Sequence, residues 1–263
     1  MITCDVRGLV GFIPAYLTYP QHVSEFVRYI AQARAGLADA DLDLTSFSTL
    51  ASEDPYPITY YTGTTETTCL AVMRELLDAS GSYMYFSGAG KLVVGQMRFR
   101  TAALSVNQSF GQGLIVRIRK IANPMTLWEL KLGYGVSWTV QDNATLAGAA
   151  RETAHADLVS EKRRYVTDDL GSKVSPMSRT ETHETFYQSA TDAAAEATRR
   201  LGFWDSTFGL YEIELAEVQF LITVGTTVKI TYGRFGFESG LDLFVLGVAE
   251  NASTRRTIIQ AFG

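Results

Sequence analysis

The stretch VGTTVKITYGRFGFESG, residues 224–240, contains the residue types from which phosphate-binding and metal-binding loops are built. A phosphate-binding loop of this kind needs a G-x-G-x-x-G spacing with a helix directly after it. Here that spacing is missing, and Val228, Ile230 and Tyr232 alternate with polar residues as in a half-buried strand. Arg234 stands where a kinase metal loop would carry an aspartate, which argues against such a loop. We expect Arg234 to pair with a carboxylate at a rim or subunit contact. The stretch therefore predicts a strand bordered by turn glycines, not a ligand loop.

Two pairs of carboxylates could support glycoside hydrolysis, in which one acid protonates the leaving group while the other attacks the sugar or activates water. These pairs are Glu181 with Glu184, and Asp168 with Asp169. Both lie in strongly polar stretches without the apolar residues that would raise the pKa of a catalytic acid. We therefore expect solvated charges at both places.

The remaining metal ligands and nucleophiles are scattered along the sequence. His22, His155 and His183 lie far apart, and Cys4 and Cys69 lack the spacing of a metal site. No G-x-S-x-G turn marks a nucleophilic serine. The sequence predicts no enzyme: no catalytic residue, no cofactor or cofactor-binding residue, and no metal ligand. The two cysteines are expected to be small buried side chains.

Composition restricts the classes of partner. The 263 residues carry 23 basic and 28 acidic side chains, a formal net charge of −5, whereas nucleic-acid binders usually have a basic surplus. Hydrophobic residues make up 46% of the chain, enough for a buried core. No run approaches the roughly 18 uncharged apolar residues of a membrane helix, so no membrane insertion is expected.

The elements that would position any site follow from hydrophobic periodicity. Val23, Phe26, Val27 and Ile30 share one helix face, and the helix over 64–79 is expected to start at Thr64 or Thr65 and to stop before Gly81. The predicted helices cover residues 20–36, 45–50, 64–79, 143–156 and 191–203.

Alternating and β-branched stretches predict the strands, with a hairpin turn at Gly88-Ala89-Gly90. Residues 163–170 and 179–187 are polar enough to be edge strands or extended connections. The predicted strands cover residues 2–8, 82–87, 91–97, 113–121, 127–140, 163–170, 179–187, 211–218, 226–233, 243–251 and 255–262.

Four stretches, taken together and in order, resemble a known family. They are ITCDVRG at the start, VMRELLDASGSYMYFSGAGKLVVGQM, LGYGVSWTVQDNATLAG at 132–148, and the closing RRLGFW with VGTTVKITYGRFGFESGLDLFVLGVAEN. Their order and spacing are similar to the C-terminal portion of tail-tip or baseplate-hub proteins of long-tailed bacteriophages and prophages.

The resemblance implies an α+β fold, with β-barrel modules like those of tail tubes and peripheral amphipathic helices. Residues 1–100 would form an α+β hub module, and 101–263 a β-barrel hub module with a helical insertion at about 143–203. It implies a structural virion protein at the tail tip or baseplate, assembled in the host cytoplasm. A homotrimeric ring would connect the tail tube to a central spike or fibres and contact distal tail and tape-measure proteins. The genome would pass through its lumen without specific binding.

Two other functions stay open. In a receptor- or carbohydrate-binding tail module, Trp138 or Trp204 would serve as a stacking platform, although each lies where a core residue is the simpler expectation. In a tail-associated cell-wall hydrolase, Glu181 and Glu184 would be the catalytic carboxylates.

Overall fold

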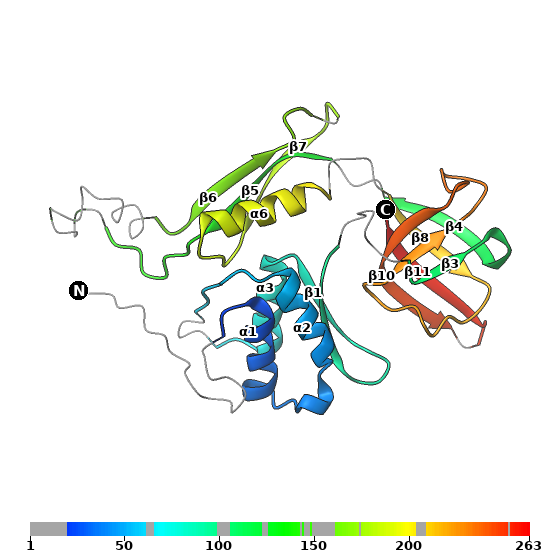
Figure 1. Ribbon diagram of the computed structural model, residues 1–263, viewed down its shortest axis with the longest axis horizontal. Helices are drawn as coiled ribbons and strands as arrows, with labels where there is room; N and C mark the ends of the chain where they lie inside the picture. Colours follow the sequence, from blue (N-terminus) through cyan, green and yellow to red (C-terminus); the bar gives the residue numbers. More distant parts are fainter. Residues whose placement is uncertain are drawn as a thin grey trace. The chain divides into compact units, whose positions relative to one another are not determined.

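Figure 1 shows the computed structural model of the chain. It describes residues 20–61, 66–98, 106–122, 126–142, 144, 148, 161–173, 175–203, 209–251 and 253–263. The chain groups into two compact units. Unit 1 comprises Met1–Gln96, Leu130–Asp168 and Thr182–Thr198, and unit 2 comprises Met97–Glu129, Asp169–Glu181 and Arg199–Gly263. The predicted strand over 2–8 and most of the predicted helix over 143–156 lie outside the described residues.

The first helix of unit 1, α1 (Val23–Tyr29), confirms the predicted apolar face. The Glu25 carboxylate accepts hydrogen bonds from the backbone N–H groups of Gln21 at 2.7 Å and of the N-cap residue His22 at 3.4 Å. The second satisfies a donor that the helix start would leave unpaired. The chain continues as the π-helical turn η1 (Ile30–Arg34). It leaves the helix at Gly36, whose φ of +77° favours glycine.

The second helix is longer than predicted from the sequence. A short helical turn was expected at 45–50, whereas α2 spans Leu44–Glu53, after the 3₁₀ turn η2 (Asp39–Asp41). Asp43 explains the difference, because its side chain accepts hydrogen bonds from the backbone N–H groups of Thr45 and Ser46 and caps the helix start.

The third helix, α3 (Cys69–Ala79), confirms the predicted helix but starts later. Its N-cap is Thr68, whose hydroxyl accepts a hydrogen bond from the Ala71 N–H at 3.2 Å. The expected caps, Thr64 and Thr65, lie outside the described residues. Gly81 follows the helix with φ +64°, as a C′ glycine does.

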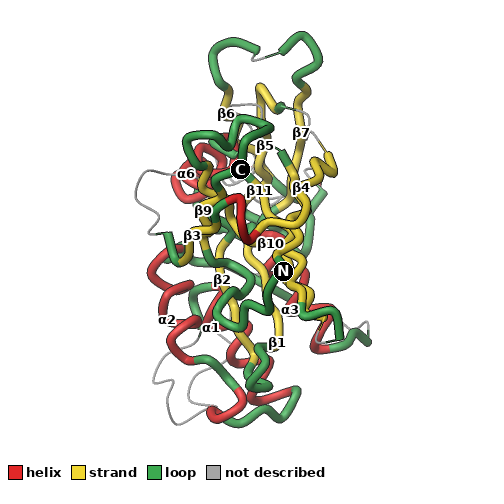
Figure 2. Tube along the Cα trace, turned by 90° about the vertical axis from the view of Figure 1, so that its right-hand side faces the viewer, coloured by secondary structure: helices red, strands yellow, loops and turns green. Residues whose placement is uncertain are grey.

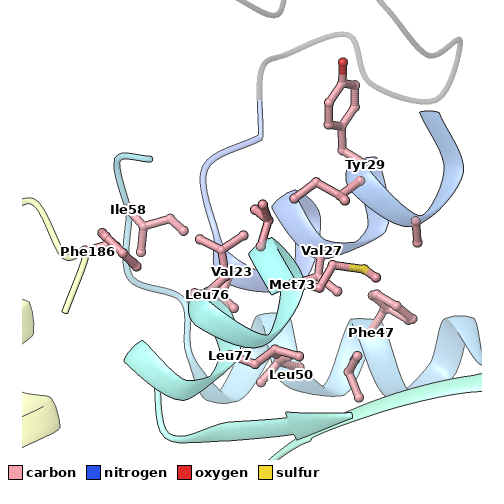
Figure 3. Close-up of a cluster of buried hydrophobic side chains, with 14 of the residues drawn as sticks. Val23, Val27, Tyr29, Phe47, Leu50, Ile58, Met73, Leu76, Leu77 and Phe186 are labelled. Atoms are coloured by element: carbon pink, nitrogen blue, oxygen red, sulfur yellow. The ribbon is translucent and has the colours of Figure 1, made fainter. Parts of the chain in front are cut away.

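The hairpin predicted around Gly88 to Gly90 is confirmed as β1 (Ser82–Phe86) paired antiparallel with β2 (Leu92–Gln96). Figure 2 shows α1, α2 and α3 in red beside these strands. Their shared core is drawn in Figure 3, where side chains from all three helices meet those of Ile58 and Phe186. Val27, Leu50 and Leu76 have no exposed surface.

A buried polar contact ties a distant segment to this core. The Tyr187 hydroxyl donates to both oxygens of the Asp54 carboxylate, at 3.1 and 3.2 Å, and both residues are 1% exposed. Beside it, Ile58 forms an antiparallel bridge with Tyr187, and the Thr59 N–H donates to the Phe186 carbonyl at 3.0 Å. The segment that follows α2 is thereby held against residues 186–188.

A three-stranded sheet has the order β6-β5-β7, with β5 (Leu127–Tyr134) in the centre. The polar strands β6 (Arg164–Asp169) and β7 (Arg179–Glu184) are its edges, which confirms one of the two alternatives predicted for them. The helix predicted over 191–203 is confirmed as α6 (Ala190–Leu201).

Unit 2 contains a curled sheet whose order is β3-β9-β10-β11-β8-β4. Its strands are β3 (Gln108–Phe110), β4 (Ile115–Ala122), β8 (Leu210–Leu215), β9 (Thr227–Ile230), β10 (Leu241–Asn251) and β11 (Arg256–Phe262). The four strands predicted for the last sixty residues are therefore confirmed. Along β8, Tyr211, Ile213 and Leu215 are buried while Glu212 and Glu214 face outward, the alternation of a strand with one buried face.

The connection from β3 to β4 determines the curl of this sheet. These strands are first and last in the order, yet only Gly111 and η3 (Gln112–Leu114) separate them. Four residues span at most about 14 Å, so the two edges must approach each other. A bulge between Val245 and Gly247 in β10 bends the sheet in the middle. The result is a curled half-barrel, which together with the helices confirms the predicted α+β fold class.

We predict that Leu76→Ala lowers the free energy of unfolding by about 2–5 kcal/mol, because Leu76 is fully buried among the three helices. The matched control is Leu70→Ala on the same helix, where the side chain is 46% exposed and the expected change is below about 0.5 kcal/mol. Urea unfolding followed by circular dichroism measures both. Equal shifts of the two variants would show that the core is not organised as described.

Candidate assembly edge and aromatic site

The glycine-rich stretch at 224–240 is strand and turn, as the sequence predicts. β9 occupies its middle, and Gly225, Gly236 and Gly240 all have positive φ, between +82° and +87°. Arg234 is exposed and has no carboxylate partner among the described residues, so the expected ion pair is not found there.

The predicted carboxylate pairs do not converge. Neighbouring residues of a strand point to opposite faces, as do residues three apart, so Asp168 diverges from Asp169 in β6 and Glu181 from Glu184 in β7. All four carboxylates have specific partners: Asp168 accepts from the Thr198 hydroxyl at 2.6 Å and Asp169 from the Gly171 N–H at 2.7 Å, while Glu181 pairs with Arg179 and Glu184 pairs with Arg163 at 3.3 Å. The two carboxylates of each pair are therefore not placed to act on the same substrate.

The other candidate ligand-binding residues do not come together either. Cys69 is half-buried against the core of unit 1, while Cys4, His155 and Trp204 lie outside the described residues. Across the described ranges, His, Cys, Asp and Glu form no group of three that could hold a metal ion. No helix within the same ranges has the length and hydropathy to cross a bilayer.

The outer edge of β4 is a candidate assembly surface. Within the described residues β4 pairs with β8 alone, and β3, which approaches from the other end of the sheet, has three residues against eight in β4. Val116 and Ile121 on β4 are 42% and 41% exposed. An edge strand with unpaired backbone groups and apolar side chains readily adds another strand or packs against a neighbouring chain.

Ion pairs cross the face next to this edge. Arg119 of β4 lies 3.0 Å from Glu212 of β8, and Arg117 lies 3.6 Å from both Glu212 and Glu214. Glu214 also pairs with Arg256 of β11. Both β4 guanidinium groups are more than half exposed, so their stabilising effect is about 0–1 kcal/mol per pair. Beside the open edge they form a strip of alternating charges, with exposed arginines on β4 and glutamates on β8.

A second candidate site begins with two glycines of the LGYG motif. A methyl group at Gly133 would overlap the Arg163 side chain, and one at Gly135 would come within 2.7 Å of the Arg164 guanidinium. The glycines thus let both arginines cross the end of β5, where Arg164 lies 5.0 Å above the Tyr134 ring. Sequence reasoning missed this role, although a glycine inside a strand indicates close approach of another group.

Arg163 supports a stack of aromatic rings. It donates to the Thr185 carbonyl and pairs with Glu184, and its guanidinium lies 5.6 Å from the centre of the Phe186 ring. Trp138 stacks on Phe186 at 6.1 Å with 16° between the planes. Trp138 is nevertheless 43% exposed, so the expectation that it is a core residue is wrong.

Two tyrosines make T-shaped contacts with Trp138. Tyr60 makes edge contacts with Trp138 at 6.0 Å and with Phe186 at 5.0 Å, and Tyr61 makes another with Trp138 at 6.0 Å. The Tyr60 hydroxyl donates to the Glu75 carboxylate at 2.6 Å. Burial raises the pKa of Tyr60 well above its ordinary value, and the Glu75 contact raises that pKa further. The phenol therefore stays neutral and holds its ring in place.

Tyr60 and Tyr61 also line a pocket of about 480 Å³ in the same unit. Its walls are otherwise apolar at α1, η1 and α3, and its polar side chains include Arg34, Glu66 and Thr67. Among the described residues Arg34 and Glu66 have no hydrogen-bond or ion-pair partner, so both can contact a ligand.

Solved structures share this fold. A protein chain in the virion of a native gene transfer agent particle matches 96% of this chain and 49% of its own length, with a TM-score of 0.57 and 13% identity. A tail protein from Neisseria meningitidis matches 92% of this chain and 67% of its own, with a TM-score of 0.49 and 10% identity. A prophage tail protein from Listeria monocytogenes matches 80% and 57%, with a TM-score of 0.42 and 11% identity. No protein-family model and no curated protein sequence matches.

These neighbours are phage tail and virion proteins, and the resemblance predicted from the sequence is confirmed at the level of the fold. The virion chain carries this conclusion, because its TM-score exceeds 0.5 and its match extends over nearly all of this chain. The chain spans about half to two thirds of the length of these structures.

We predict that Gly133→Ala destabilises the protein by about 1–3 kcal/mol, because the added methyl group must displace Arg163 or bend β5. Gly88→Ala is the control, since a methyl group there meets no atom within 4 Å and the glycine has no positive φ. Thermal unfolding compares the two. A Gly133→Ala variant as stable as the control would contradict the proposed packing of Arg163.

Proposed function

We propose that this chain is a structural component of a phage-type tail tip or baseplate hub. The observation that carries the proposal is the fold shared with a virion protein over 96% of the chain. The divergent carboxylate pairs support a structural role, because surfaces and not a reacting centre are what the described residues bring together. The proposal includes two hub modules. The first covers residues 1–100, and the second covers 101–263 with a helical insertion at about 143–203.

The proposed assembly is a ring, with three copies as the expected number. The open edge of β4 would meet a neighbouring subunit, so that closure of the ring covers the unpaired backbone groups and the exposed side chains of Val116 and Ile121. The exposed guanidinium groups of Arg117 and Arg119, which pair with Glu212 and Glu214 within the chain, would also meet acidic groups of the neighbour and orient the contact.

In a particle the ring would connect the tail tube to a central spike or fibres, with distal tail and tape-measure proteins as further neighbours. A genome would pass through its lumen without specific binding. The formal net charge of −5 supports that part, because an acidic lining repels phosphates. The proposed place is the virion tail tip, after assembly in the host cytoplasm.

The β4 edge gives the proposal a test in solution. We expect Val116→Glu and Ile121→Glu each to weaken self-association about tenfold or more, because a carboxylate would be buried at the contact. Leu70→Glu is the matched control, since Leu70 is 46% exposed on α3 in unit 1 and should leave association unchanged. Sedimentation velocity over a concentration series measures the change.

Two results would count against the ring. One is a wild-type chain that stays monomeric at every concentration, alone and with its neighbouring tail proteins. The other is an association that both β4 variants leave unchanged while Leu70→Glu disrupts it, which would place the contact on unit 1.

A further inference from the structure

Trp138 is 43% exposed although three aromatic rings contact it. Phe186 lies nearly parallel to it in an offset arrangement, and Tyr60 and Tyr61 lie at steep angles to it. A core tryptophan is buried on all sides, whereas a tryptophan that is held by its neighbours and still has this much exposed surface can serve as a flat platform.

The platform is rigid because each layer below it is anchored. The Arg163 side chain, 8% exposed, is fixed by the Thr185 carbonyl and Glu184 and supports Phe186, which supports Trp138. A ligand that stacks here meets a surface already in its bound conformation, so binding costs little ordering entropy.

The platform adjoins the pocket of about 480 Å³. Tyr61, which is 58% exposed, touches Trp138 and also lines the pocket, as Tyr60 does. Arg34, Glu66 and Thr67 are exposed there and offer both donors and acceptors. A ligand extending from the platform into the pocket would pass from a stacking surface to hydrogen-bonding groups.

We propose that Trp138, Tyr61 and the adjoining pocket form a binding site for an oligosaccharide of β-linked pyranose units. Such sugars have flat C–H faces that pack on aromatic rings, and equatorial hydroxyl or amide groups that pair with side chains like those of Arg34, Glu66 and Thr67. The opposite charges of Arg34 and Glu66 suit an uncharged ligand better than a polyanion. A nucleic acid would need a basic groove along its backbone, and at this pocket the single arginine is balanced by Glu66.

The test is isothermal titration calorimetry of the full chain with chitotetraose, a chain of four β-1,4-linked N-acetylglucosamine units. We expect saturable binding that Trp138→Ala and Tyr61→Ala each weaken by about three- to tenfold or more, while Trp138→Phe retains most of the affinity. The matched control is Phe86→Ala, an exposed aromatic of the β1–β2 hairpin at 62% exposure, which should leave binding unchanged.

Tyr61→Ala keeps the test decisive if Trp138→Ala disturbs Phe186, because Tyr61 is mostly exposed and its loss should not unfold unit 1. Co-sedimentation with purified peptidoglycan sacculi tests the same site on a bacterial source of β-linked pyranoses, with the same variants. Binding to sacculi that depends on Trp138 and Tyr61 supports the proposal.

The proposal is overturned if neither probe binds, or if Trp138→Ala and Tyr61→Ala bind as well as the wild type. The choice of bacterial peptidoglycan as the source of the sugar rests on the proposed tail function. The sugar site and the tail function can fail separately. If the chain associates through β4 but binds no sugar, only the sugar site is contradicted. If the chain binds sugar but forms no assembly, only the tail function is contradicted.

Discussion

The short link between β3 and β4 is the constraint on which the half-barrel depends. A six-strand order that begins at β3 and ends at β4 could lie open as a twisted sheet if the chain between them were long. With Gly111–Leu114 as the only connection, the sheet has to curl until its edges approach. The curl encloses the apolar faces of the strands, and Ile213, Val228, Leu243 and Ile259 in its core have no exposed surface.

The same constraint leaves part of one edge open. β3 is too short to cover β4, whose Val116 and Ile121 therefore stay exposed beside the ion pairs of Arg117 and Arg119. In a monomer this edge is an aggregation hazard, and in a closed ring it becomes an interface. The curled sheet thus links the fold shared with a virion protein to the proposed assembly.

Much of the fold was predictable because local signals agree with tertiary structure. The helix faces around Val27 and Leu76 and the alternation in β8 and β9 are patterns that burial enforces over many residues. Boundaries were less predictable, since a single cap decides them: Asp43 lengthens α2, and Thr68 delays α3. The order of the six strands was not predictable, because it depends on contacts between residues more than a hundred positions apart, such as Gln108 with Val228.

Sequence reasoning named Trp138 as a candidate stacking residue but not the aromatic site around it, for a similar reason. The position of Trp138 depends on Phe186 and Arg163, and these three residues come from separate stretches of the chain. Only the glycines of LGYG gave a local hint, because glycine in a strand interior indicates that another group lies close. Solvent exposure of the Trp138 ring is a property of the packed structure, and no periodicity encodes it.

A cryo-electron-microscopy map of the intact particle, with this chain traced in it, tests the central claim most directly. The account predicts a closed ring of copies at the distal end of the tail, with β4 of each copy at the contact with the next. Copies on the capsid or along the tail shaft, or a ring closed through surfaces that leave β4 exposed, would contradict it.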